Sequence, residues 1–198
     1  MNEFIEALKK RRSIYMLGRN VKMPQDEIEE LVKEVVELSP TAFNSQSQRV
    51  VILFDKAHEK VWDFTEAELK KVTPADRFPT TQAKIKGFRD AYGTILFFED
   101  QETVKALQKK FPTYADNFPI WSEQASGLTT SNVWTALATA GIGANIQHYN
   151  PLIDEDVAAE WKLPANWKLR SQMVFGSTEA EAQPKEFMDR GSRFKTFH

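Results

Sequence analysis

Cysteine is absent from this sequence of 198 residues. The absence excludes disulfide bonds, thiolate nucleophiles and zinc–thiolate sites, so any redox chemistry has to be carried by a cofactor. An excess of charge of one sign is also lacking, because 26 Lys and Arg residues oppose 28 Asp and Glu residues and give a formal net charge of -2. This balance gives no electrostatic reason to expect nucleic acid or an anionic membrane as a partner, and we expect neither.

No apolar run approaches the roughly 18 residues that a membrane-spanning helix needs. The first segment, MNEFIEALKKRRS, is amphipathic and charged, and it differs from a signal peptide, in which a basic stretch precedes an apolar one. We therefore expect a cytoplasmic location.

Several motifs that indicate a particular chemistry are also missing. The three histidines, His58, His148 and His198, lack the spacing of metal ligands, so we expect no metal site. The P-loop pattern and the GxSxG pattern of hydrolases do not occur. Gly141 and Gly143 lack the third glycine of a dinucleotide fingerprint, which means that a nicotinamide, if used, is not held by a Rossmann half.

The sequence does contain enough apolar material for a core, with 41% hydrophobic and 12% aromatic residues. No repeat, low-complexity tract or linker divides it, so we predict one domain over residues 1–198. The tail from about residue 177 to 198 is polar, yet it contains Phe187, Phe194 and Phe197, which are costly to leave in water. We expect this tail to pack on a partner subunit.

Hydrophobic periodicity predicts alternating helices and strands. Helices are expected over residues 2–12, 24–39, 58–71, 82–92, 101–110, 121–140 and 155–161. Strands are expected over residues 49–54, 94–98 and 169–175, with a short strand-like piece ending at 147. The segment 121–140 has few charges and no clear polar stripe, so we expect a buried central helix there.

Three separated segments follow these helices: Arg11-Arg12-Ser13, the sequence SPTAFNSQ at residues 39–46, and Gly141-Ile142-Gly143-Ala144-Asn145. In order, spacing and chain length they resemble the nitroreductase family, and the resemblance covers essentially the whole chain. The chain is most similar to the compact subgroup related to the yeast fatty-acid-repression proteins and the stress-induced bacterial nitroreductases, in which the second segment also reads like SPTAFNSQ.

The resemblance implies an FMN site. Arg11, Arg12 and Ser13 suit a phosphate, because guanidinium groups and a hydroxyl donate charge-assisted hydrogen bonds to it. Taken alone, two arginines after a helix also fit simple stabilisation of the helix dipole. The resemblance further implies that Arg193 and Lys195 close the phosphate site, although a solvated basic tail explains them equally well.

The other two segments are implied to surround the flavin ring. Amides and a hydroxyl for its polar edge and for the ribityl chain come from Asn44, Ser45 and Gln46, which the resemblance implies reach across a dimer interface. A plain helix-terminating loop is the alternative. Gly143 and Ala144 are expected to bring backbone close to the flavin N5, and a helix cap followed by a strand is the alternative.

Aromatic residues complete the expected pocket. Tyr15 is a candidate for the FMN pocket, although an aromatic there is more often simply packed. The candidate walls of the substrate pocket are Phe43, Phe88, Tyr92 and Trp121. For each of them, burial in the core is the alternative. The shorter middle region has no clear match to the asparagine and lysine that hold the pyrimidine edge in larger nitroreductases.

The resemblance implies an α+β fold with a mixed, mainly antiparallel central sheet flanked by helices, in an intertwined homodimer with FMN at the interface. It further implies ping-pong transfer of a hydride from NADH or NADPH through FMN N5 to nitroaromatics, quinones or similar planar acceptors, without a catalytic side chain. Two alternatives stay open: a flavin-binding regulatory protein linked to lipid or stress signalling with incidental reductase activity, and a plain interaction domain.

Overall fold

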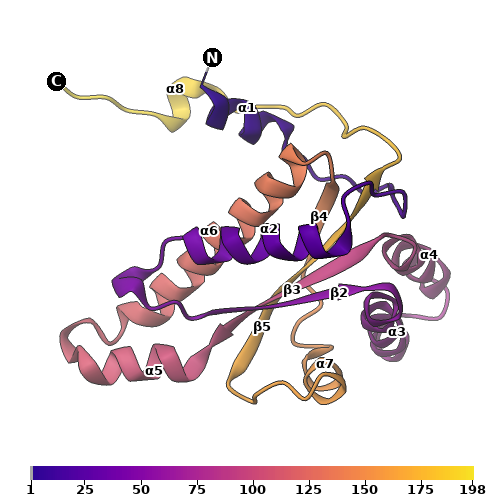
Figure 1. Cartoon of the computed structure of the whole chain (residues 1–198), viewed down its shortest axis with the longest axis horizontal. Helices are drawn as coiled ribbons and strands as arrows, with labels where there is room; N and C mark the ends of the chain where they lie inside the picture. Colours follow the sequence, from indigo (N-terminus) through magenta and orange to yellow (C-terminus); the bar gives the residue numbers. More distant parts are fainter. Residues whose placement is uncertain (1) are drawn as a thin grey trace.

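The computed structural model describes residues 2–198 and contains a central sheet with helices on both faces (Figure 1). The helices are α1 (Glu3–Lys10), α2 (Gln25–Leu38), α3 (Asp55–Val72), α4 (Phe78–Arg89), α5 (Gln101–Lys110), α6 (Asn117–Thr139), α7 (Asp154–Glu160) and α8 (Arg190–Arg193), with 3-10 turns at Ala42–Asn44 and Pro112–Tyr114. The strands are β1 (Leu17–Gly18), β2 (Gln48–Phe54), β3 (Gly93–Asp100), β4 (Gly143–Gln147) and β5 (Trp167–Thr178). The α+β class is confirmed.

The five strands pair in the order β1-β5-β3-β2, and β4 pairs with β5. Each of these strand pairs is antiparallel. The parallel component in residues 2–198 is a single isolated bridge between Ser13 and Ala144. β5 is long enough to pair with β3, β4 and β1, so it connects the two ends of the sheet.

Two apolar clusters fill the space between the sheet and its helices. Every residue of β3 is buried, and its side chains alternate between the two faces. Leu96 and Phe98 join a cluster with α3, α4 and α7 that contains Trp62 and Ile85. Ile95 and Phe97 join the cluster formed with α2 and α6.

The long helix α6 differs from its prediction in two respects. It begins at Asn117 rather than near residue 121, because Pro119 falls in the first turn, where a helix tolerates proline. It is also buried on one face only. Its opposite face exposes apolar and small side chains, including Ile120 (56% exposed) and Leu128 (49% exposed), so the chain leaves an apolar surface uncovered along α6.

The tail after β5 runs back over the end of the molecule that holds α1 (Figure 1). Arg12 donates a hydrogen bond of 2.5 Å to the carbonyl of Gln183 and so attaches the tail to the segment after α1. Phe187, Phe194 and Phe197 are all exposed within this chain. Packing of the tail on a partner subunit stays a prediction.

Candidate functional site

An open groove of about 760 Å³ lies between α6 and strands β4 and β5, and we call it the α6–β4 groove. One wall comes from α6, the floor comes from the end of β4 and from β5, and the segment after α1 closes one end. Its lining residues are Arg11, Glu123, Ser126, Gly127, Thr130, Ser131, Trp134, Ile146, His148, Asn150, Arg170 and Ser171.

Arg11 lies at one end of the groove with its guanidinium 4.3 Å from the centre of the Trp134 ring. Helix α1 ends at Lys10, two residues before its prediction, and Arg11 already has extended backbone. The next residues bond to β4, since the Ile14 N–H donates to the Ala144 carbonyl at 2.9 Å. Burial, and secondarily the charge of Arg12, lower the pKa of Arg11.

Hydrogen-bond donors gather at this end of the groove. The indole Nε1 of Trp134 is buried without a hydrogen-bond partner among the described residues. A second cavity of about 410 Å³ adjoins the groove through Arg11 and is also lined by Arg12, Ser13 and Tyr15. The structure therefore brings these four predicted residues together at one place, where a cation and unpaired N–H groups suit an anion. Arg12 itself is bonded to the tail.

The remaining predicted residues of this region lie elsewhere. Arg193 and Lys195 are exposed in the tail and line neither cavity. Gly143 and Ala144 are buried in β4, opposite Gly176 and Phe175 of β5. They do not line the α6–β4 groove, because Ala144 faces the core cluster of α2 and α6.

The floor of the groove comes from residues that the sequence analysis missed. Ile146, His148 and Asn150 lie farther along the same chain segment, at the end of β4 and just beyond it. The signal for them was the change after Ile146 from an apolar strand to the polar sequence QHYN, which places polar side chains at the open end of a strand.

The loop of residues 39–46 is strained. Phe43, Asn44 and Gln46 have φ angles of 57°, 50° and 48°, in the left-handed region that residues with a side chain rarely adopt. Each such residue costs on the order of 1 kcal/mol, so surrounding contacts have to hold the loop in place. Thr41 Oγ1 accepts a hydrogen bond of 3.1 Å from the backbone N–H of Gln46.

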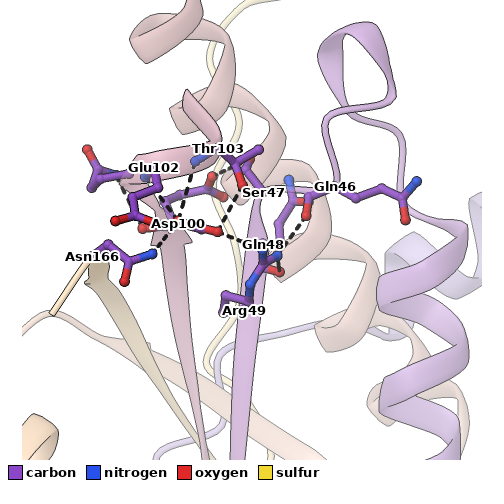
Figure 2. Close-up of polar contacts among 10 residues, drawn as sticks. Gln46, Ser47, Gln48, Arg49, Asp100, Glu102, Thr103 and Asn166 are labelled. Atoms are coloured by element: carbon purple, nitrogen blue, oxygen red, sulfur yellow. Dashed lines mark hydrogen bonds and ion pairs between the residues drawn. The ribbon is translucent and has the colours of Figure 1, made fainter. Parts of the chain in front are cut away.

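A polar network clamps the end of this loop to α5. Figure 2 shows Arg49 directed at both the loop and Asp100, with donor distances of 2.7 Å to the Gln46 carbonyl and 2.7 Å to Asp100 Oδ2. Asp100 caps α5 and also accepts a hydrogen bond of 2.6 Å from the side-chain amide of Asn166. Burial alone would raise the pKa of Asp100, but hydrogen bonds from Thr103 and Asn166 hold it below its ordinary value.

Aromatic side chains surround the strained loop. The rings of Phe43 and Trp121 stack at 6.0 Å with an interplanar angle of 19°, and Phe111, Tyr114 and Phe118 pack around Phe43. Phe43 is 51% exposed and lines a pocket of about 360 Å³ between the loop and the N-terminal half of α6. The structure thus brings together two of the four predicted wall residues.

The other two predicted wall residues, Phe88 and Tyr92, pack in or against the apolar clusters of the fold. Phe88 is buried against Trp62, with ring centres 4.9 Å apart. Tyr92 packs edge-on to Phe54, with ring centres 6.0 Å apart, and also contacts Phe175. Neither residue lines the α6–β4 groove or the pocket beside Phe43, and their role as pocket walls stays a prediction. Helical spacing identifies an apolar face without telling whether core or ligand covers it.

The two parts of the predicted site lie on different flanks of α6. The α6–β4 groove uses Glu123, Thr130 and Trp134, whereas the aromatic pocket uses Trp121, Ala125 and Leu128. At 100° per residue these two sets project in clearly different directions from the helix. Residues Asn44, Ser45 and Gln46 therefore do not reach Arg11 within one chain.

The far end of the groove carries a charged cluster. Arg170 Nε donates 2.9 Å to Glu123 Oε2, and both side chains line the groove. Glu99 lies buried nearby and accepts a hydrogen bond of 2.6 Å from Ser47 Oγ. Its other carboxyl oxygen has no hydrogen-bond partner among residues 2–198. Burial raises the pKa of Glu99 to about 7, against the opposing effects of Ser47 and of the cation Arg170.

Two absences among residues 2–198 concern a membrane span and a metal site. No helix in this range has both the length and the apolar character needed to cross a membrane. Within the same range, no cluster of three or more His, Asp or Glu side chains could hold a metal ion.

Comparison with known proteins identifies the family. The model of the nitroreductase family matches residues 8–177. Nitroreductase CinD of Lactococcus lactis, solved with nicotinic acid, is 56% identical and covers 98% of this chain and 100% of its own, with a TM-score of 0.93. Nitroreductase FRM2 of Saccharomyces cerevisiae is 34% identical over 193 residues, 94% of this chain and 93% of that protein.

A third comparison concerns the fold alone. A nitroreductase with bound FMN from Desulfitobacterium hafniense is 16% identical, with a TM-score of 0.72 over both complete chains. The fold and the sequence similarity agree, and this chain belongs to the nitroreductase family. It is therefore an oxidoreductase, and the family resemblance seen in the three separated segments is confirmed.

Proposed function

We propose that this protein is an FMN-dependent oxidoreductase that uses NADH or NADPH to reduce nitroaromatics, quinones or similar planar acceptors, and that it works as a homodimer. The observation that carries the proposal is the end of the α6–β4 groove, where Arg11 stacks on Trp134 without an acidic partner among residues 2–198. Its relative CinD has been solved with 4-nitrophenol and with chloramphenicol, both nitroaromatic compounds, which supports this substrate class.

The donor set of the groove fits FMN. Arg11 and Ser13 offer a cation and a hydroxyl to the phosphate, and the unpaired Trp134 Nε1 offers a further N–H. Gly127 on the α6 wall has open space where a side chain would project, so a flat ring can approach the helix closely. The volume of about 760 Å³ lies in the range of small-molecule and cofactor sites.

FMN, when bound, supplies the chemistry of accepting a hydride from a reduced nicotinamide and passing electrons to an acceptor. The residues of this chain bind and orient it. Arg11 neutralises the phosphate, the polar groups His148 and Asn150 line the floor, and α6 keeps water from one side of the groove. No catalytic acid or base is required of the protein.

A second copy of the chain completes the proposed site. The exposed face of α6 between the two flanks contains Ile120, Gly127 and Leu128, whose burial would stabilise a dimer. A two-fold axis along this face would bring the loop 39–46 of one chain to the α6–β4 groove of the other. The strain in that loop fits this role, because strained backbone in proteins clusters at binding and catalytic sites.

The proposal is tested by spectroscopy of the purified protein. Bound FMN should give flavin absorption bands that bleach with NADH or NADPH in the absence of oxygen and return on addition of 4-nitrophenol. Sedimentation should show a dimer. Bands that resist reduction would favour the flavin-binding regulatory protein instead, and a monomer that takes up no FMN would refute the proposal.

A matched pair of variants tests the residue that carries the argument. Arg11→Gln should raise the Kd for FMN at least about tenfold, since a charge-assisted hydrogen bond contributes roughly 1.5–3 kcal/mol. Lys10→Gln removes the neighbouring exposed charge, which does not line the groove, and should leave the Kd unchanged. Equal effects of the two substitutions would show that only the general positive potential matters.

A further inference from the structure

The far end of the α6–β4 groove carries a feature that the proposed function does not use. Arg11 lies beside Trp134, and Arg170 lies beside Glu123, eleven residues earlier on α6. At 1.5 Å per residue these two positions are about 16 Å apart along the helix. A cofactor anchored by its phosphate at Arg11 therefore leaves Arg170 to meet whatever binds at the opposite end of the groove.

Arg170 is an oriented guanidinium. Its Nε donates 2.9 Å to Glu123 Oε2, and a second nitrogen contacts Glu123 Oε1, so the carboxylate occupies the fork of the guanidinium. The Arg170 side chain is only 20% exposed, whereas that of Glu123 is 48% exposed. Glu123 is thus the outer and more exposed partner, and Arg170 is the inner one.

A buried carboxyl group on β3, that of Glu99, lies near Arg170. Glu99 attracts Arg170, although burial lowers the pKa of the arginine. Glu99 itself is fixed by Ser47, and it also faces the charges of Arg49 and Asp100. Arg170 therefore keeps a buried carboxyl group in its surroundings when Glu123 moves away, and another carboxylate can take the place of Glu123.

We propose that Arg170 is a specificity-determining residue which binds the carboxylate of an aromatic acceptor, and that Glu123 is an internal competitor which this carboxylate displaces. The inference rests on the proposed function. An arginine fork matches the planar geometry of a carboxylate, and the same fork now holds Glu123. A purely structural ion pair half-open to solvent would stabilise the fold by only about 0–1 kcal/mol and would not have to line the groove.

Two acceptors of matched shape test the proposal: 4-nitrobenzoate, which is anionic, and 4-nitrobenzamide, which is neutral. The quantity measured is the ratio of kcat/KM for the anion to that for the amide. Arg170→Gln should lower this ratio about tenfold to hundredfold, because a lost charge-assisted hydrogen bond costs roughly 1.5–3 kcal/mol. Glu123→Gln should raise the ratio about tenfold, mainly through a lower KM for the anion.

Two further variants control the experiment. Arg170→Lys keeps the charge without the fork and should recover part of the preference. Lys168→Gln removes an exposed cation of the same strand that does not line the groove and should leave the ratio unchanged. If Arg170→Gln fails to fold, Glu123→Gln still decides, because it retains Arg170.

Binding without turnover gives an independent readout. The Kd of benzoate for the oxidised, FMN-loaded protein, followed by the shift of the flavin absorption band, should fall in Glu123→Gln and rise in Arg170→Gln, while that of benzamide stays constant. A ratio and a Kd that neither substitution changes would overturn the proposal, as would an effect confined to the KM of NADH or NADPH. A protein that reduces neither acceptor would instead refute the proposed function.

Discussion

The buried carboxyl of Glu99 makes the stability of the protein depend on pH in a way that one substitution should remove. Glu99 lies under α6 with no exposed surface and with one oxygen unpaired among residues 2–198. Burial raises its pKa from 4.5 to about 7. The folded state therefore holds this proton more tightly than the unfolded state does.

The sign and size of the effect follow from this difference. A raised pKa gives stability that is fully present below pH 4.5 and is lost as the pH rises through about 7. Each unit of pKa difference corresponds to about 1.4 kcal/mol, so the full contribution is about 3 kcal/mol. Most of it should disappear between about pH 5 and about pH 8.

Glu99→Gln tests this reasoning, because glutamine is a neutral group of the same shape as the protonated carboxyl. The free energy of unfolding is measured by urea denaturation at a fixed protein concentration across this pH range. The variant should gain about 2–3 kcal/mol relative to the wild type from about pH 5 to about pH 8. A difference that stays constant with pH would refute the reasoning and would mean that Arg170 keeps Glu99 ionised.

Three further outcomes are expected. Burial lowers the pKa of His58 from 6.5 to about 4, so its contribution to stability, up to about 3 kcal/mol, should be lost as the pH falls through this interval. The free energy of unfolding of His58→Gln should not show this loss. A pH dependence equal to that of the wild type would contradict burial of a neutral imidazole. Asp100→Ala removes the cap of α5 and the partner of Arg49, so urea denaturation should show a free energy of unfolding lower by about 2–3 kcal/mol. A decrease below about 0.5 kcal/mol would show that the polar network of Figure 2 does not stabilise the fold. Arg12→Gln releases the Gln183 carbonyl, so trypsin should cleave after Lys185 faster than in the wild type, and equal rates would show that the tail is held elsewhere.

The sequence predicted the elements of the fold well where periodicity was strong. The apolar runs of β2, β3 and β5 and the amphipathic pattern of α2 lie where they were expected. Element ends were less accurate: α1 stops two residues early, and α6 starts four residues early. These ends depend on local capping and on where proline falls, which hydrophobic periodicity does not report.

The site was only partly predictable. Residue type and motif made Arg11, Ser13 and Trp121 candidates, and the structure places each of them at a cavity. Arg170 was missed because a single cation on a strand gives no pattern. The burial of Glu99 depends on Ser47, 52 positions away in the chain, and such long-range pairing leaves no local signal.

The separation of the loop 39–46 from the α6–β4 groove on the two flanks of α6 has a genetic consequence. Under the proposed two-fold arrangement, each site combines the α6–β4 groove of one subunit with the loop 39–46 of the other. A substitution at Arg11 inactivates the groove of its subunit, and a substitution in the loop inactivates the part that its subunit contributes to the partner's site. In a mixed dimer both defects fall on the same one of the two sites, and the other is assembled from two intact halves. Two inactive alleles of this gene would then complement one another when expressed together, restoring up to half of the normal activity per mixed dimer.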